Sequence, residues 1–131
     1  MRRALLLAAV FFVAAFTAKA QDPVKIDPAH NKVEFENAQV RVLRFTYGPH
    51  EKSAMHQHPA NVVVFLTDAH VKFTLPDGKT VEKEAKAGET VWNAPAKHES
   101  ENASDKPLEG LQIELKATPA AAKTPTAKEK S

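Results

Sequence analysis

The sequence predicts an all-β, antiparallel sandwich or barrel formed by a single domain, and three observations predict it. The chain has 131 residues, which is the length of one domain. Its apolar residues recur mostly with a period of two, as in strands with one buried face. Turn signals separate short apolar segments every eight to twelve residues, a spacing typical of antiparallel sandwiches and barrels.

Each expected strand rests on its own pattern. The segment 40–47 is rich in β-branched and aromatic residues, 62–66 is a continuous apolar run, and 71–75 alternates strictly. The sequence Pro-Asp-Gly-Lys at 76–79 predicts a tight turn after that segment. No segment after residue 20 has the pattern of a helix of two turns. We expect strands, in chain order, at 33–36, 40–47, 62–66, 71–75, 80–85, 90–92 and 111–115.

The N-terminal segment 1–20 has the three parts of a secretory signal peptide. Arg2 and Arg3 precede an apolar run of thirteen residues at 4–16, and Ala18 and Ala20 provide a small-residue cleavage site. We therefore expect a cleaved signal, a mature chain beginning at Gln21, and a periplasmic or secreted protein with no membrane span after cleavage. The alternative is an uncleaved membrane anchor, although the apolar run is short for a bilayer.

The C-terminal segment 117–131 contains Ala, Pro, Thr and Lys but no large apolar residue, so we expect a disordered, solvated tail. The remaining chain divides into an N-terminal extension with the first strand at 21–39 and a barrel at 40–116. The formal charge of +2 arises at the two ends, and residues 21–116 carry −3. This mildly acidic body argues against a nucleic-acid partner. The absence of cysteine excludes disulfides and thiolate metal ligands.

The histidines are the most informative chemical feature. His56 and His58 form a His-x-His pair, and residues i and i+2 of a strand point to the same face. Two imidazoles on one face can bind one metal ion together, and His98 is the best candidate for a third ligand. The alternative is a pair of surface histidines on a polar loop.

Two segments resemble the conserved motifs of the cupin superfamily. The first, residues 48–66, contains a glycine, a short spacer, the His-x-His pair and an apolar strand. The second, residues 88–102, opens with a glycine and continues with Pro95, His98 and Asn102. The resemblance covers about residues 40–115. It implies a cupin-type antiparallel β-barrel (jelly roll) with a metal near its axis, ligated by His56, His58 and His98. It also implies that Asn102 closes a turn.

The chain departs from the cupin pattern at one ligand position. Asn61 stands where these proteins usually have a glutamate, with Val62 as the neighbouring choice, and Pro95-Ala-Lys-His98 is tighter than the usual spacer. The expected site therefore has three histidines and water. Imidazole ligands favour a divalent transition metal (Fe, Zn, Mn, Ni or Cu) over calcium or magnesium. The ligand set is similar to that of the thiol dioxygenases, and a metal-free cupin remains an alternative.

Other residues have less specific interpretations. Asn61, Phe65 and Trp92 are candidate pocket residues. For Phe65 and Trp92 we favour a place in the core, with Trp92 at the pocket mouth as the alternative. His50 is a candidate acid or base, unless it lies in solvent at a strand end. Glu99 is a candidate to orient a ligand histidine.

Two functional hypotheses follow. The first is a metal-dependent oxygenase or isomerase that acts on a small organic molecule, with its catalytic residues unassigned. The second is a non-catalytic cupin barrel that binds a small ligand or a metal, or binds no metal. The resemblance also implies a homodimer.

Overall fold

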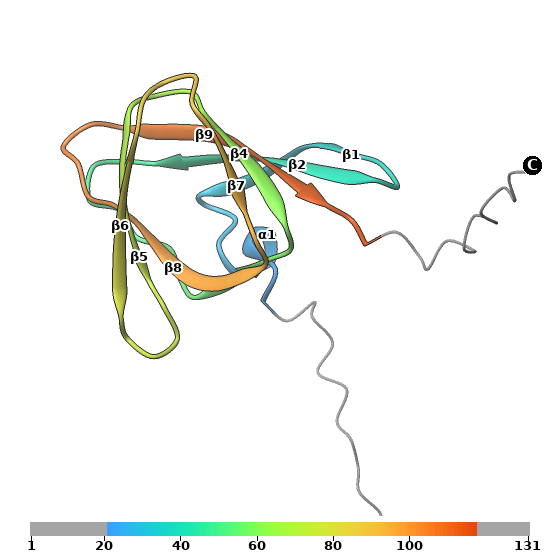
Figure 1. Ribbon diagram of the computed structural model, residues 1–131, viewed down its shortest axis with the longest axis horizontal. Coiled ribbons are helices and arrows are strands. Elements are labelled where there is room, and N and C mark those ends of the chain that lie inside the picture. Colours follow the sequence, from blue (N-terminus) through green and yellow to red (C-terminus); the bar gives the residue numbers. More distant parts are fainter. Residues whose placement is uncertain (1–20, 118–131) are drawn as a thin grey trace, which may run out of the picture.

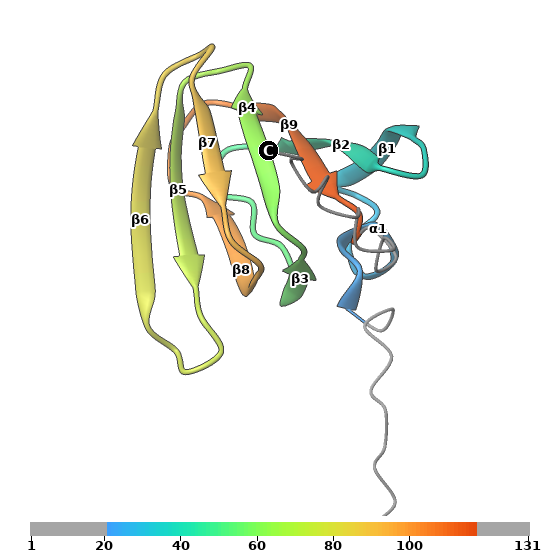
Figure 2. The same ribbon diagram turned by 45° about the vertical axis from the view of Figure 1, so that its right-hand side comes forward.

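The computed structural model describes residues 21–117, which form two antiparallel sheets that face each other (Figures 1 and 2). The five-stranded sheet has the order β1-β2-β9-β4-β7, and the four-stranded sheet has the order β3-β8-β5-β6. The strands of the first sheet are β1 (Asn31–Glu36), β2 (Val40–Tyr47), β9 (Leu108–Leu115), β4 (Asn61–Phe65) and β7 (Thr90–Asn93). Those of the second are β3 (His56–His58), β8 (Ala96–Asn102), β5 (Ala69–Thr74) and β6 (Thr80–Ala85).

The all-β prediction is confirmed, with a correction to the expected barrel. No strand of one sheet is paired to a strand of the other within residues 21–117, so the two sheets are not closed into a continuous barrel. The single helix of this region, α1 (Pro23–Ile26), is one turn long, with the Asp22 side chain accepting a bond from the amide of Val24 at 2.9 Å. No helix in the described part of the chain is long and apolar enough to cross a membrane. The signal peptide and the tail expected at 1–20 and 117–131 lie outside the described residues, apart from Ala117.

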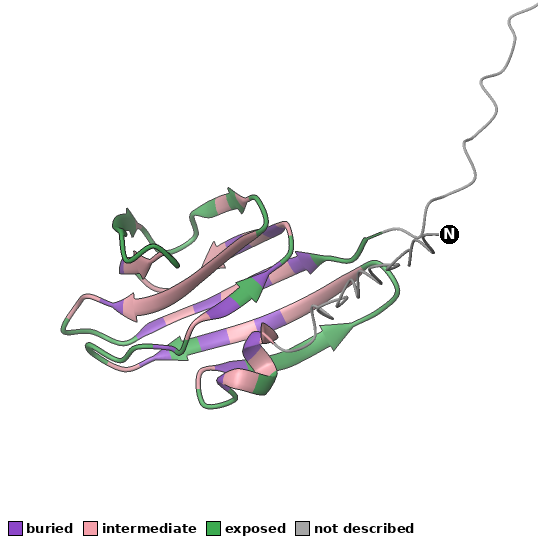
Figure 3. Cartoon of the chain, turned by 90° about the horizontal axis from the view of Figure 1, so that it is seen from below, coloured by how far each residue is buried: buried purple, intermediate pink, exposed green. Residues whose placement is uncertain are grey.

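Hydrophobic residues from both sheets form the core between them. Leu43 and Leu108 are almost fully buried, and a side chain of this size contributes about 1.5–3 kcal/mol when it leaves water. Phe45 lies edge-on to Phe65, with ring centroids 6.4 Å apart. Buried and partly buried residues alternate along β9 and at the start of β4, as the period-two pattern predicted, whereas β1 and β6 are mostly exposed (Figure 3).

The absence of a side chain at Gly110 leaves room in this core for the ring of Phe45. A Cβ added at Gly110 would lie 2.2 Å from the ring, a distance that no real contact reaches. Gly110 is buried in β9 together with Leu108, Gln112 and Glu114. The inner face of this strand therefore carries two polar side chains, while Leu111 and Ile113 are on its outer face.

Asn102 closes a turn, as the cupin resemblance implied. Its side chain is fully buried at the end of β8 and donates to the carbonyl oxygens of Lys106 at 2.7 Å and Gly48 at 3.0 Å. Its side-chain oxygen accepts a bond from the amide of Ser104 at 3.1 Å. One side chain thus connects the loop after β8 to the loop after β2.

Candidate metal centre

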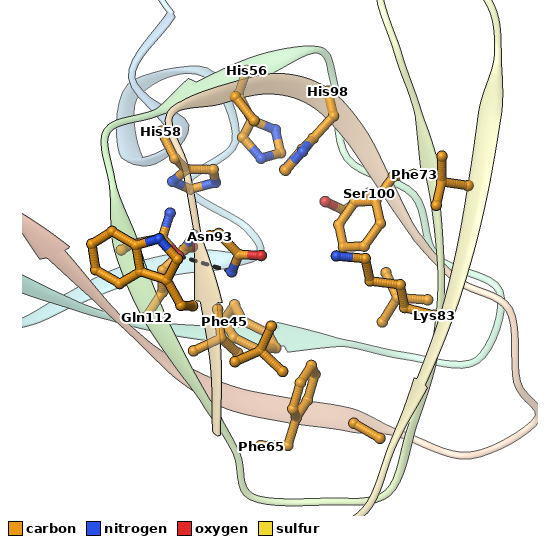
Figure 4. A pocket seen from close by; sticks show the side chains of 18 of the residues that line it. Phe45, His56, His58, Phe65, Phe73, Lys83, Asn93, His98, Ser100 and Gln112 are labelled. Carbon is orange, nitrogen blue, oxygen red and sulfur yellow. Dashed lines mark hydrogen bonds between the residues drawn. The ribbon is translucent and has the colours of Figure 1, made fainter. Parts of the chain in front are cut away.

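His56, His58 and His98 converge at one end of the space between the sheets (Figure 4). Each offers a ring nitrogen, and these three atoms lie within 4.8 Å of one another. The ring centroid of His56 is 4.7 Å from that of His58 and 5.0 Å from that of His98. His56 and His58 are 1% and 3% exposed. His56 and His58 are therefore interior residues of a strand and not surface histidines on a loop.

All three histidines come from the four-stranded sheet. His56 and His58 share one face of β3, as expected, and His56 is directly opposite His98 in the antiparallel register of β3 and β8. His98 therefore lies in the same sheet as the His-x-His pair, on the neighbouring strand. The sequence of β8, Ala-Lys-His-Glu-Ser-Glu-Asn, is polar and does not predict a strand, yet β8 pairs directly with β3.

Two of the rings are held with Nε2 free. Nδ1 of His56 donates to the carbonyl oxygen of Ala54 at 2.8 Å, and Nδ1 of His58 donates to Oε1 of Glu114 at 2.8 Å. A carbonyl and a carboxylate only accept, so each neutral ring carries its proton on Nδ1 and its lone pair on Nε2. This is the tautomer in which Nε2 can ligate a metal.

Glu114 orients His58, and the sequence analysis did not identify it. This carboxylate is buried on β9 and also accepts bonds from Arg41 at 2.7 Å, while Arg41 bonds Asp22 at 2.7 Å. The signal in the sequence is an acidic residue at a buried position of an alternating strand. Glu99, which we considered for this role, instead pairs with Lys52 at 2.7 Å.

Asn61 lies in the cavity next to this cluster, as expected. It is 2% exposed and is the first residue of β4. Only Pro59 and Ala60 separate it from the end of β3. Its Nδ2 donates to the Pro59 carbonyl at 2.9 Å, and its Oδ1 accepts from Nδ2 of Asn93 at 3.2 Å (Figure 4). The cavity that these groups line has a volume of about 420 Å³, which is within the range of small-molecule sites.

No family model matches the sequence, and no curated protein matches it significantly. Among solved structures, a cupin domain from Bordetella pertussis Tohama I superposes with a TM-score of 0.62 at 26% identity. The match covers 66% of this chain and 92% of that chain. The chain belongs to the cupin superfamily.

Two further structures share the fold of this cupin. A conserved protein with a double-stranded β-helix domain from Klebsiella pneumoniae has a TM-score of 0.53 at 16% identity, covering 79% of this chain and 90% of that one. A polyketide cyclase from Streptomyces resistomycificus has a TM-score of 0.50 at 17% identity, covering 68% of this chain and 66% of that one. At these identities the two matches describe the fold alone.

Burial disfavours protonation of two histidines of the cluster, His56 and His98. It lowers the pKa of His98 to about 3, and repulsion from the Lys83 ammonium and from any proton on His56 or His58 acts in the same direction. Burial also lowers the pKa of His56, again with a contribution from His58. Neutral imidazole is the form that donates a lone pair to a metal, so these two rings are available as ligands near neutral pH.

The other candidate pocket residues have different outcomes. Phe65 and Trp92 both line the cavity. Phe65 also packs against the core, as we favoured. Trp92 is 60% exposed, so its expected core position is wrong; it is opposite Val62 on the outer face of the sheet, at an edge strand from which its side chain also reaches the cavity. The physical reason is that β7 is an edge strand, in which Val91 and Asn93 are the more buried residues.

His50 does not reach the cavity, which corrects its expected role as an acid or base there. Its side chain is 59% exposed, and Nε2 bonds Oδ1 of Asp105 at 2.6 Å. A positive φ of 60° at His50 forms the turn that follows Gly48. His50 is therefore one of the solvent-exposed histidines, the alternative named for it from the sequence.

Tyr47 is a second titratable group at the cavity that the sequence analysis passed over. It is buried on β2, lines the cavity, and stacks on His30 with ring centroids 4.3 Å apart. Burial raises the pKa of its hydroxyl to about 12. The phenol therefore stays protonated near neutral pH and presents a hydrogen-bond donor.

Proposed function

We propose that this cupin domain binds a divalent transition metal at His56, His58 and His98 and a small organic molecule in the adjoining cavity. The observation that carries the proposal is the set of three clustered ring nitrogens, with two rings held so that Nε2 is free. Three neutral nitrogen donors suit iron, zinc, manganese, nickel or copper, and they leave coordination positions open.

The residues around the cluster fit such an ion. Glu114 would orient His58 and supply the negative charge behind it, as carboxylates commonly do for ligating histidines. Asn61, held by Pro59 and Asn93, adds a neutral amide beside the three imidazoles. A bound metal of this kind supplies Lewis-acid or oxygen chemistry at its open positions.

An oxygenase or isomerase acting on that small molecule is the more specific form of the proposal. Tyr47 is the group that can donate a hydrogen bond to a substrate near the cluster. The polyketide cyclase of similar fold supports the idea that this architecture can hold an enzyme. The second candidate is a non-catalytic binding domain, which the exposed position of His50 favours because it removes an acid or base from the cavity.

Metal titration tests the proposal. Metal-stripped protein is titrated with zinc and with ferrous iron, and the titrations are repeated for His56→Ala, His58→Ala and His98→Ala. Each substitution should weaken binding at least tenfold, or about 1.4 kcal/mol. His70→Ala is the matched control, because His70 is partly exposed and bonds Glu82 away from the cavity. Binding that is equal in all variants, or absent in the parent, would refute the proposal.

We further propose that the protein acts outside the cytoplasm, after removal of residues 1–20. The basic start, the apolar run and the Ala18-Lys19-Ala20 site support this. N-terminal sequencing of protein from the periplasm or medium should begin at Gln21. An intact Met1 in the membrane fraction would contradict it.

We also propose a homodimer that covers the outer face of the five-stranded sheet. Cross-strand neighbours there form a continuous apolar row, and its two ends, Phe35 and Trp92, are 54% and 60% exposed. The row runs through Phe35, Val42, Ile113, Val62 and Trp92. Sedimentation should find a dimer that Trp92→Lys dissociates. Val81→Lys, an exposed apolar position on the other sheet, should leave it intact, and a monomeric parent would refute the proposal.

A further inference from the structure

Lys83 interrupts an apolar row on the cavity wall. In the register of β5 and β6, Val71 is opposite Lys83 and Phe73 is opposite Val81. Opposed residues of an antiparallel pair point to the same face, and Val71 belongs to the core. The inward positions of β6 are therefore Val81, Lys83 and Ala85, and all three line the cavity.

The ammonium group of Lys83 points into the cavity below His98 and Ser100 (Figure 4). Its neighbours in sequence, Glu82 and Glu84, are on the opposite face of β6, and Glu82 bonds His70 there at 2.9 Å. Within residues 21–117, no carboxylate oxygen lies within 4.0 Å of the Lys83 ammonium, whereas Lys72 pairs with Glu101 at 2.9 Å.

One acidic residue, Glu84, lines the cavity, but it is on the outward face of β6 and its carboxylate is not within 4.0 Å of the Lys83 ammonium. Glu114 lies behind His58 and is already bonded to that ring and to Arg41. The remaining walls are largely apolar, formed by residues such as Phe45, Phe65, Phe73, Val63 and Leu108. The cavity thus combines a large apolar surface with one ammonium group that has no carboxylate of the described residues within 4.0 Å, and this ammonium is the group that attracts an anion.

We propose that the ligand of this cavity is a carboxylate with an apolar, ring-sized body. Its carboxylate pairs with the Lys83 ammonium, and its body lies against the aromatic side chains of β2, β4 and β5. The inference rests on the proposed function, because it assigns the chemical class of the molecule that occupies the same cavity. Lys83 is itself exposed, so water and salt screen part of this pairing, and the acid should bind more tightly at low ionic strength.

Paired probes separate the charge from the body of the ligand. Benzoate, phenylacetate and 3-phenylpropionate are each compared with the corresponding amide by titration calorimetry and by chemical-shift mapping. Metal-stripped protein is used, because a bound metal would itself attract carboxylates. The parent should bind at least one acid tenfold or more tightly than its amide, with shifts at β5 and β6.

Substitutions then assign the preference to Lys83. Lys83→Met should reduce the acid-to-amide ratio to about one, while Lys83→Arg should retain most of it. Lys79→Met is the matched control, since it removes the same charge from the exposed end of the same hairpin, where Lys79 is 3.8 Å from Asp77. Both methionine variants should give folded spectra and bind zinc as the parent does.

The outcomes distinguish this inference from the proposed function. The inference is overturned if the acid preference survives Lys83→Met, or if the parent binds no acid better than its amide. Neither result bears on the metal site, which the zinc titration tests separately. A parent that prefers acids through Lys83 but binds no zinc supports the inference and refutes the metal centre.

Discussion

The cavity histidines and the outer histidines have opposite surroundings. Each of the three outer rings bonds a carboxylate: His30 bonds Asp27 and Glu51, His50 bonds Asp105, and His70 bonds Glu82. In the cavity, only His58 contacts one, and His56 bonds the carbonyl of Ala54 instead. The carboxylates are thus concentrated around the histidines that lie outside the cavity.

This difference shows how one residue type serves two purposes in a small domain. Burial lowers the pKa of His30, but its bonds to Asp27 and Glu51 outweigh burial and raise the pKa above the usual value. In the cavity, burial dominates and lowers the pKa of His98 to about 3. His30 therefore holds a proton as part of an ion-pair network, whereas His98 keeps its lone pair available.

Removing the charge of the carboxylate that bonds a cavity histidine should have the largest effect on the difference between the two groups of histidines. Glu114→Gln leaves the Arg41 guanidinium with Asp22 alone and gives the ring of His58 a neutral amide oxygen as its acceptor. We expect a loss of about 3 kcal/mol in the free energy of unfolding, because the buried ion pair between Glu114 and Arg41 is broken. Zinc affinity should also fall roughly 10–100-fold.

Glu109→Gln is the control for this substitution. Glu109 is on the same strand and pairs with Arg44, but its side chain is 39% exposed. Its loss should cost at most about 1 kcal/mol and leave zinc affinity unchanged. Urea unfolding and zinc titration measure both effects. Equal effects of the two substitutions would contradict the role of Glu114 in orienting His58.

Acidification should destabilise the metal-stripped protein through the cavity histidines. In the unfolded chain a histidine takes up a proton near pH 6.5, but folded His98 resists protonation to about pH 3. The stability tied to the neutral ring is present above pH 6.5 and is lost as pH falls below it. The loss should be about 2 kcal/mol between pH 6.5 and 5 for this one group. Urea unfolding should show that His98→Gln flattens this slope, and an unchanged slope would contradict the shifted pKa.

The period of two and the His-x-His pair were sufficient to predict much of this molecule. Both are local patterns: alternation determines which residues of a strand share a face, and it placed His56 and His58 together. β2 coincides with the expected segment 40–47, and β6 with 80–85. The turn expected at 76–79 joins β5 to β6, with Gly78 at a positive φ of 85°.

The features that the sequence did not reveal depend on pairing between distant segments. The strand β8 contains no large apolar residue, so only its partners β3 and β5 define it. Glu114 meets His58 across 56 residues of chain. The open edges of the two sheets likewise depend on where pairing stops, and no local pattern marks the exposure of Trp92 on an edge strand.

Asn61→Asp tests the same difference between the two groups of histidines, because it places a carboxylate beside the histidines of the cavity. Asp has nearly the shape of Asn and can still accept the bond from Asn93, but it cannot donate to the Pro59 carbonyl, so the free energy of unfolding should fall by about 1–3 kcal/mol. A negative charge beside three neutral imidazoles should tighten zinc binding about tenfold, or about 1.4 kcal/mol. Zinc titration measures this, and weaker or equal binding would mean that residue 61 does not reach the ion.

The smallest expected effect concerns His30, one of the histidines outside the cavity that bond carboxylates. Because the folded pKa of His30 is raised above its unfolded value, the protonated ring stabilises the fold fully below about pH 6.5. That contribution is lost as pH rises through the folded pKa. His30→Gln should therefore lower the free energy of unfolding more at pH 6 than at pH 8.5, by under about 1 kcal/mol because Glu51 is half exposed. Stacking on Tyr47 is lost at every pH, so only the pH-dependent part of the difference, measured by urea unfolding, reports the charge. A difference that grows with pH would mean that His30 is held neutral, like the histidines of the cavity.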